Sequence, residues 1–462
     1  MHLNKEIYIE RRKSLKSKLK SGIILLNGND YASMNYEHNV YHFIQDASFL
    51  YYFGIEKAGL LGLIDIDNNI DYLVGNEQNI NSVIWEGATA SLSDYSELIG
   101  TDKILSILDL EEFLRSDTRK KYFTPQYRGD NKLKMANLLN LNPYNINENV
   151  DEKLLYAIAS DRNIKSSEEI ELMEESARVG VEMHLEALKT AKIGKKEYEV
   201  ESAIKAVAAK YYGDLSFPSI VSVNGQTLHN PYYKNTLKNG DLLLVDAGVR
   251  LKSGYCSDMT TTIPVNGKFS DKQKSMYNLL IEMYDKALLL LKPKVSYKEI
   301  HLETAKVLAK GMIERDIMKA SVEEIVKAGA HALFMPHGLG HLIGLDVHDM
   351  ENFGEKIIGY NGEEKSKQFG LSNLRLGRKL EKGFAITVEP GIYFIPELIS
   401  KWKSENKFME FINYEKIENE YLDYGGMRYE NDFIITDSGA YQLGGKRPKT
   451  ADEIEAFMAN QG

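Results

Sequence analysis

Acidic residues placed at or inside apolar, strand-like runs constrain the fold of this sequence more than any other feature. Asp246 ends the run LLLV, Glu389 ends the run AITV, and Glu430 lies in the segment MRYENDFII. Burying an unpaired carboxylate costs several kcal/mol, and loss of water raises its pKa unless a cation holds it ionised. Because three strands share this pattern, the sequence predicts a sheet whose buried acids face a common positive partner.

Each acid also has an ordinary explanation when it is taken alone. Asp246 could be a capping or turn aspartate beside Gly248, and Glu389 precedes a Pro-Gly pair that is typical of a turn. Glu430 could pair with Arg428 in a salt bridge at a strand edge. These alternatives stay open for each residue by itself.

A histidine cluster lies between the first and the second of these strands. His337, His341 and His348 fall within twelve positions, although the whole chain has only ten histidines. The first two have the spacing of a helical pair of zinc ligands, but glycines lie between them and no Glu follows the first, so we expect a bent loop. One such histidine alone would be structural, whereas a cluster beside Asp346 and Asp349 favours metal binding or acid–base chemistry.

Asp258 completes a set of two aspartates, two glutamates and a histidine. Such a hard, oxygen-rich set suits Mn²⁺, Co²⁺ or Fe²⁺ better than metals that prefer thiolates. Four carboxylates also neutralise two divalent ions that share a bridging hydroxide. The composition therefore predicts a two-metal site without locating it.

Charge, hydropathy and cysteine content exclude several classes of function. The net charge of −10 is spread over mixed Lys/Glu-rich stretches, so the chain lacks the basic face that nucleic acid requires. The longest apolar runs, such as 287–291, fall far short of the about 20 residues that cross a bilayer, so no membrane association is expected. Cys256 is the only cysteine, which excludes intramolecular disulfides and a thiolate zinc cage and fits a reducing cytoplasm.

The length of 462 residues predicts about two or three domains, and we expect two. Strands alternate with helices over residues 1–160, which indicates a compact α/β domain. Its N-terminal helix is expected to turn a basic face to solvent, with Tyr8, Leu15 and Leu19 pointing inward. The other expected elements are strands at 22–26, 59–66 and 71–74 and helices at 109–115 and 132–139.

A second domain is expected over residues 161–462. It opens on a long amphipathic helix at 166–192, because Ser166 and Glu169 have capping-box spacing and Gly194 ends the pattern. An α+β pattern with a substantial antiparallel sheet follows, and it holds nearly all of the candidate chemistry. The expected helices are 197–212, 271–291 and 297–313, and the expected strands are 220–223, 242–249, 259–264, 385–389 and 428–436.

Four motifs in fixed order, DAG…D, HGLGHxxGLDVHD, TVEPGIY and GxRxEN, resemble those of metal-dependent peptidases of the pita-bread fold. Within that superfamily, residues 165–440 are similar to Xaa-Pro aminopeptidases (aminopeptidase P) and Xaa-Pro dipeptidases (prolidases). The segments NYEH at 35–38 and FIQDASFLYYFG at 43–54 resemble the aminopeptidase P N-terminal domain. The resemblance implies an α/β N-terminal domain followed by an α+β pita-bread (creatinase/aminopeptidase-like) catalytic domain.

The resemblance also implies two bound divalent metal ions, with Mn²⁺ favoured and Co²⁺, Fe²⁺ or Zn²⁺ as alternatives. The implied metal ligands are Asp246, Asp258, His341, Glu389 and Glu430. Asp258 and Glu430 bridge the ions, and a hydroxide between the metals would attack the carbonyl before proline. His341 matches the ligand of the family, which leaves His337 in a supporting or structural role.

Further residues match positions of the family that act on the substrate. Glu389 matches the proton shuttle, and His229 and His348 match histidines that steady the tetrahedral intermediate. Arg428 matches a residue that orients the site. Arg375 aligns with an arginine that clamps a substrate carboxylate in prolidases.

The sequence departs from the family pattern at several places. One extra residue separates Asp246 from Asp258, and Asn431 stands where an acid is common, but neither change removes a ligand. Insertions lie at 351–383 and at 396–424, and the second is closer in length to that of prolidases.

The resemblance favours an Xaa-Pro aminopeptidase that acts on peptides with proline in second position and forms a homo-oligomer, either a dimer or a tetramer. The alternatives are a prolidase, a non-catalytic binding protein on the pita-bread scaffold, and a metal-free hydrolase of the creatinase kind. All five implied ligands are present, which weighs against the non-catalytic alternative.

Overall fold

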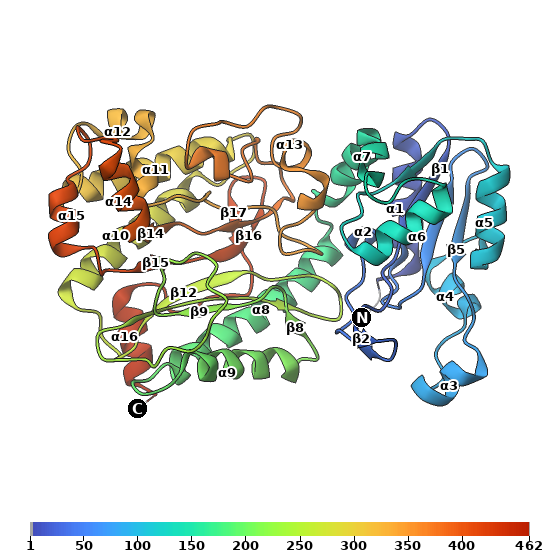
Figure 1. Ribbon diagram of the computed structural model, residues 1–462, viewed down its shortest axis with the longest axis horizontal. Helices are drawn as coiled ribbons and strands as arrows, with labels where there is room; N and C mark the ends of the chain where they lie inside the picture. The colour runs from blue at the N-terminus through green and yellow to red at the C-terminus, as the bar shows by residue number, and fades with distance from the viewer. Residues whose placement is uncertain (1–2, 462) are drawn as a thin grey trace. The chain divides into compact units, whose positions relative to one another are not determined.

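The computed structural model describes residues 3–461, and the chain divides into two compact units (Figure 1). The first unit holds the chain up to Asn163 together with Met350–Ile358, and the second holds Ile164–Asp349 and the chain from Gly359 onward. Helix α13 (Glu355–Ile358) of the short segment packs against α7 (Glu152–Arg162) of the same unit. The local sequence does not predict that this segment belongs to the first unit, because the residues it packs against lie much earlier in the chain.

A mixed five-stranded sheet in the order β6-β5-β4-β1-β7 forms the centre of the first unit. Strand β1 pairs antiparallel with β4 and parallel with β7, and all five of its residues are buried, which explains its nearly continuous apolar sequence. The strands are β1 Ile23–Asn27, β2 Ser33–Tyr36, β3 Asn39–Val40, β4 Leu61–Asp65, β5 Ile70–Val74, β6 Lys103–Leu105 and β7 Lys121–Phe123. The other helices are α1 Lys5–Lys18, α2 Ala47–Phe53, α3 Ile80–Glu86, α4 Leu92–Ile99, α5 Ile107–Ser116, α6 Gly129–Leu139, η1 Ile146–Asn149 and η3 Glu351–Phe353.

Helix α1 differs from its prediction in one respect. Tyr8 and Leu15 are buried as expected, but so are Arg11 and Arg12, which the basic pattern placed in solvent. The Arg12 guanidinium donates to Asp71 and to backbone carbonyls of α2 and α4. A buried arginine of this kind cannot be predicted from α1 alone, because its carboxylate partner lies 59 residues away.

Strands of the second unit lie between helices α8 and α9 on one side and α10 to α12 on the other (Figure 1). Ser166 and Glu169 form the predicted capping box of α8. The helices are α8 Ser167–Thr190, α9 Glu197–Lys210, α10 Asp271–Leu290, α11 Tyr297–Ile313, α12 Val322–Ala328, η2 Ala330–Leu333, η4 Leu371–Asn373, α14 Pro396–Ser404, α15 Tyr414–Glu420 and α16 Ala451–Ala459. Across residues 3–461, no helix has the length and apolar composition needed to cross a membrane.

Four small sheets make up the strand layer of the second unit. Their orders are β12-β10-β9, β11-β8, β13-β16-β17 and β14-β15, and their pairings are antiparallel. An isolated antiparallel bridge between Thr260 and Glu430 joins the first sheet to the third. The strands are β8 Asp214–Leu215, β9 Ile220–Ser222, β10 Leu242–Ala247, β11 Val249–Arg250, β12 Met259–Pro264, β13 Ala385–Val388, β14 Gly391–Tyr393, β15 Gly426–Arg428, β16 Asn431–Ile435 and β17 Ala440–Gln442.

The predicted continuous strand over 428–436 is wrong. The chain pairs with β14 up to Arg428 and with β13 from Asn431, and Glu430 between them bonds through its backbone N–H to the carbonyl of Thr260. The strand breaks because its two halves have different partners. This break places the Glu430 side chain where three sheets meet.

Candidate metal centre

The five predicted ligands come from five separate places in the second unit. Four of them are buried, and Glu389 is partly exposed. Asp246 lies on β10, Asp258 directly precedes β12, His341 lies in the loop after η2, Glu389 follows β13, and Glu430 lies between β15 and β16. Sheet pairing therefore brings together residues that are up to 184 positions apart in the sequence.

Three of these side chains converge closely enough to hold one ion. Asp258, His341 and Glu430 each offer a ligand atom, and these atoms lie within 4.8 Å of one another. The Nε2 atom of His341 is 3.4 Å from Oδ2 of Asp258 and 3.8 Å from Oε1 of Glu389. Carboxylate and imidazole donors from separate elements thus share one small volume.

Asp246 faces the centre from β10. Its Oδ2 atom accepts a hydrogen bond from Arg428 Nη2, while its Oδ1 atom is buried without a hydrogen-bond partner among the described residues. The predicted alternative, in which Arg428 pairs with Glu430, is met by an ion pair of 4.0 Å between Nε of Arg428 and Oε2 of Glu430, while Nη2 of the same guanidinium pairs more closely with Asp246. The unpartnered oxygen of Asp246 remains available to a cation.

The loop that carries His341 is bent, as predicted, and backbone contacts fix its shape. The His341 N–H donates to Oγ1 of Thr387, and the Thr387 N–H donates to the His341 carbonyl. A side chain at Gly340 would collide with the Thr387 carbonyl and with the Tyr297 hydroxyl. Because Nδ1 of His341 lies 3.0 Å from the Leu342 carbonyl, it carries the proton and leaves the Nε2 lone pair facing the acids.

The acids of the centre disfavour one another's charge. Burial, followed by the charge of nearby acids, holds the pKa of Asp258 and of Glu430 well above the usual range. Burial also raises the pKa of Glu389, although His341 and Arg428 oppose that shift. Ionised carboxylates in this volume need a cation. The hard donors and the unpartnered Asp246 oxygen fit divalent metal ions.

The predicted substrate-facing residues lie near this cluster. The His348 ring stacks on the His341 ring, with centroids 3.8 Å apart and an angle of 15° between the planes. Burial and the positive charges of Arg428 and Arg375 lower the pKa of His229, which lies on the loop after β9. Arg375 follows η4, and its charge also acts on Glu389. All four residues therefore belong to the same region as the predicted ligands.

A chain of hydrogen bonds through Tyr393 and His337 holds the Arg428 side chain in place. The Arg428 guanidinium donates to the Tyr393 hydroxyl over 2.7 Å, and that hydroxyl lies 2.9 Å from Nε2 of His337. Since Nδ1 of His337 lies 2.7 Å from the Gly338 carbonyl, Nδ1 carries the proton and Nε2 accepts from Tyr393. Burial lowers the pKa of His337 to about 3, so the ring is neutral. His337 thus supports Arg428 and lies 3.7 Å from Glu389.

Sequence reasoning missed three residues, two of which contact predicted ligands and one of which contacts Arg428. Thr260 donates to Oε2 of Glu430, Asp432 accepts from the backbone N–H of Asp258, and Tyr393 binds Arg428. The run TTT inside a strand that is buried throughout was the available signal, because buried hydroxyls need partners.

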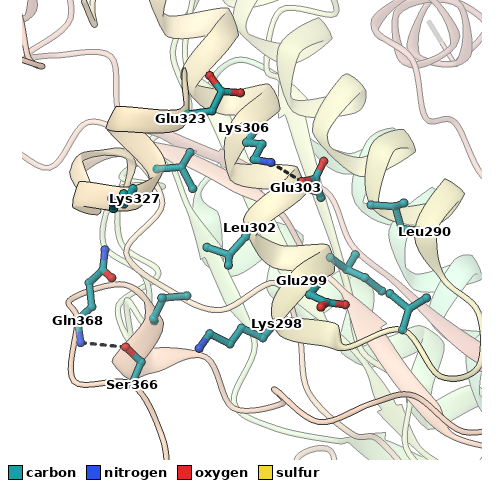
Figure 2. A pocket seen from close by; sticks show the side chains of 14 residues that line it. Leu290, Lys298, Glu299, Leu302, Glu303, Lys306, Glu323, Lys327, Ser366 and Gln368 are labelled. Atoms are coloured by element: carbon teal, nitrogen blue, oxygen red, sulfur yellow. Dashed lines mark hydrogen bonds and ion pairs between the residues drawn. The ribbon is translucent and has the colours of Figure 1, made fainter. Parts of the chain in front are cut away.

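A separate cavity of about 760 Å³ lies elsewhere in the second unit. Figure 2 shows it between α11, α12 and the segment 366–371, with Lys306 paired to Glu303. No predicted site residue lines it. The cavity is therefore not the candidate centre.

The fold and the cluster of hard donors define a metal-dependent enzyme. The chain belongs to metallopeptidase family M24, whose profile matches residues 171–437. Residues 8–123 match the aminopeptidase P N-terminal domain. Both matches confirm the resemblance inferred from the motifs and the predicted fold class, an α/β domain followed by a pita-bread domain.

Curated relatives and solved structures resemble the chain over most of its length. The Xaa-Pro dipeptidase of Rattus norvegicus is 30% identical and covers 99% of this chain and 93% of its own. A probable Xaa-Pro aminopeptidase of Talaromyces marneffei is 31% identical, covering 82% of this chain and 79% of its own. Zn-substituted E. coli aminopeptidase P, in complex with product, has a TM-score of 0.81 at 25% identity and full coverage of both chains. Pseudomonas aeruginosa aminopeptidase PepP has a TM-score of 0.82 at 26% identity, and the match covers 100% of this chain and 99% of that one.

Proposed function

We propose that the chain is a two-metal Xaa-Pro aminopeptidase that removes the first residue from peptides with proline in second position. The observation that carries the proposal is the convergence of Asp258, His341 and Glu430 within 4.8 Å in the pita-bread unit. The match to the aminopeptidase P N-terminal domain and the likeness to solved aminopeptidase P structures support the choice of activity.

Five residues hold the ions in this proposal: Asp246, Asp258, His341, Glu389 and Glu430. Divalent metals bound there supply an activated water at neutral pH and polarise the carbonyl that is attacked. Mn²⁺ is the proposed ion, with Co²⁺, Fe²⁺ or Zn²⁺ as alternatives, because the donors are mostly hard oxygens. The unpartnered, buried Oδ1 atom of Asp246 supports a cation at this point.

Glu389 is the proposed proton carrier. It is the one acid of the set that is partly exposed. Its raised pKa suits a carboxylate that takes a proton from the attacking water and gives it to the proline nitrogen as the peptide bond breaks. Nδ1 of His337 and Nε2 of His341 lie 3.7 and 3.8 Å from its two oxygens.

His229, His348, Arg375 and Arg428 are proposed to act on the substrate. The stack of His348 on His341 fixes the His348 ring at the rim of the cluster, where a ring N–H can donate to the oxygen that gains charge during attack. Arg428 is held by Asp246 and Tyr393 and orients the site. Arg375 supplies a positive charge for the carboxylate of a short peptide.

A prolidase activity is the second candidate. Relatives described as Xaa-Pro dipeptidases match 99% of this chain. The resemblance also implies that the insertion at 396–424, which holds α14 and α15, is closer in length to that of prolidases. Both activities use the same chemistry, since proline removes the amide N–H and restricts the residue before it. The two differ in whether a residue must follow proline.

Matched peptides separate the two candidates. Turnover of Ala-Pro-Ala and of Ala-Pro is measured with purified protein after dialysis against a chelator and after addition of Mn²⁺. We expect the tripeptide to be cleaved with the higher kcat/KM, and only when Mn²⁺ is present. Exclusive cleavage of the dipeptide would replace the proposal by prolidase, and full activity in the chelated protein would replace it by a metal-free hydrolase.

A further inference from the structure

Arg447 links the two sheets that carry Asp258 and Glu430. It lies between β17 and α16 and is 8% exposed. Its Nη2 atom donates to the carbonyl of Thr260 over 2.7 Å and also to the carbonyl of Glu430. These two residues form the isolated bridge between the sheets. One guanidinium nitrogen therefore binds both sides of the backbone bridge between these two sheets.

The rest of the guanidinium is also satisfied within the same region. Nε of Arg447 donates to Oδ1 of Asn431 over 3.0 Å, and the amide of Asn431 donates to the Tyr284 hydroxyl over 2.8 Å. The Arg447 guanidinium also lies 4.4 Å from the centroid of the Tyr429 ring. An acid at position 431 could accept from Arg447 but could not donate to Tyr284, so the asparagine matches its two partners.

A second path runs from Arg447 to β10. Nη1 of Arg447 donates to the Thr261 hydroxyl, and that oxygen lies 2.8 Å from Nδ1 of His184 on α8. Nε2 of His184 lies 3.0 Å from the Ala247 carbonyl, so Nε2 carries the proton and Nδ1 accepts from Thr261. Ala247 follows Asp246 directly. The path thus connects Arg447 to the strand of another predicted ligand.

We infer that Arg447 is a positioning residue for the metal centre. This inference rests on the proposed metal ligands. Asp258 lies two residues before Thr260, and Glu430 is itself one of the bridged residues. Loss of the guanidinium removes a donor from both buried carbonyls and leaves the Thr260 carbonyl with the Glu430 N–H alone. The bridge then loosens, and the carboxylates of Asp258 and Glu430 are no longer held at a fixed separation. Groups that hold ligands in place typically change metal affinity by about 10–100-fold.

Arg447→Met tests the inference because methionine keeps an apolar stem and removes every hydrogen bond. We expect calorimetric Mn²⁺ affinity to fall by about 10–100-fold, with a lower kcat at saturating Mn²⁺ and little change in KM. Arg447→Lys keeps the charge but can make only some of these hydrogen bonds. Its Mn²⁺ affinity and kcat should therefore lie between those of the parent and of Arg447→Met. It also serves as the test if the methionine variant does not fold.

Arg315→Met is the matched control. Arg315 also donates to backbone carbonyls in the second unit, at Gly311 and Ser275, but it touches no predicted ligand. The Arg315→Met substitution should lower the melting temperature without changing Mn²⁺ affinity. Unchanged Mn²⁺ affinity in both Arg447 variants would overturn the positioning role even if their melting temperatures fell. A parent chain that binds no Mn²⁺ would instead overturn the metal centre and this inference with it.

Discussion

Buried charges of both signs meet at the metal centre. Arg428 satisfies one oxygen of Asp246, while burial and the charge of neighbouring acids raise the pKa values of Asp258 and Glu430. A single arginine does not neutralise this set. The residues proposed to bind a cation therefore destabilise the fold when no cation is bound.

Asp258→Asn separates binding from stability. We expect Mn²⁺ binding to fall by more than the about 10–100-fold cost of changing a supporting residue, because a ligand and its charge are lost. Metal-free protein should become more stable at pH 7, since burial raises the pKa of Asp258 and disfavours its ionised form. The gain over the parent should grow as the pH rises above about 3.9, where the unfolded carboxyl ionises.

Chemical denaturation in a chelator and calorimetry with Mn²⁺ measure the two effects. Asp437→Asn is the control, because the Asp437 side chain is 80% exposed and pairs with Lys382 at the surface. It should change neither quantity. A metal-free Asp258→Asn protein that is less stable than the parent at pH 7 would contradict the account of the clustered acids.

Glu389→Gln tests the proton carrier. The amide keeps the size of the side chain but cannot take up a proton, so kcat should fall by about 10²–10⁴-fold. The fold should be intact, and the melting temperature of the chelated protein should not fall. Turnover within a few fold of the parent, measured at saturating Mn²⁺, would remove Glu389 from the proposed mechanism.

Much of the candidate centre could be predicted one residue at a time. Asp246, Glu389 and Glu430 stand out because each interrupts an apolar run that the structure buries. Tyr393 and Asp432 could not be found in this way, because their roles depend on partners 35 and 174 positions away. Sequence pattern identifies a buried charge more readily than the group that satisfies it.

Close backbone packing between elements places the histidine of the centre. The loop of His341 runs against β13 and exchanges two hydrogen bonds with Thr387. That approach is possible because Gly340 has no side chain. The position of the imidazole is thus set by a glycine and a neighbouring strand.

Gly340→Ala should therefore disturb both stability and metal binding. The added carbon would lie 2.7 Å from the Tyr297 hydroxyl and would also meet the Thr387 carbonyl. We expect a loss of about 1–3 kcal/mol in the free energy of unfolding and weaker Mn²⁺ binding, measured by denaturation and calorimetry. Gly129→Ala is the control, since its added carbon meets nothing within 4 Å in the first turn of α6. Equal Mn²⁺ affinity in Gly340→Ala and parent would show that the loop is not fixed by this contact.

Helices and strands were predictable where local pattern decides them. The capping box of α8 and the apolar run of β10 both appear within a residue or two of their predicted limits. The break at Glu430 was missed, because it comes from a change of partner strand that no local pattern encodes. Long-range pairing fixes the site, and local sequence fixes the elements that pair.

Across the whole molecule, buried neutral histidines couple stability to pH. Burial is the main cause that lowers the pKa of His301 to about 3 and of His331 to about 4. Both rings are fully buried, their centroids are 6.3 Å apart, and their nitrogens have no hydrogen-bond partner among the described residues. The folded chain therefore resists protonation at both sites.

His301→Leu should make the chain less sensitive to acid. Below about pH 6.5 the unfolded histidine takes up a proton that folded His301 refuses until about pH 3. The parent therefore loses stability as the pH falls from about 6.5 towards about 3. The leucine variant has no imidazole at this position, so this contribution to the loss is absent. Between pH 7 and pH 5 the free energy of unfolding of the variant should rise by about 2 kcal/mol relative to that of the parent.

Urea denaturation in a chelator measures the difference without a contribution from bound metal. A difference that stays constant with pH for His301→Leu would mean that its burial does not govern acid stability.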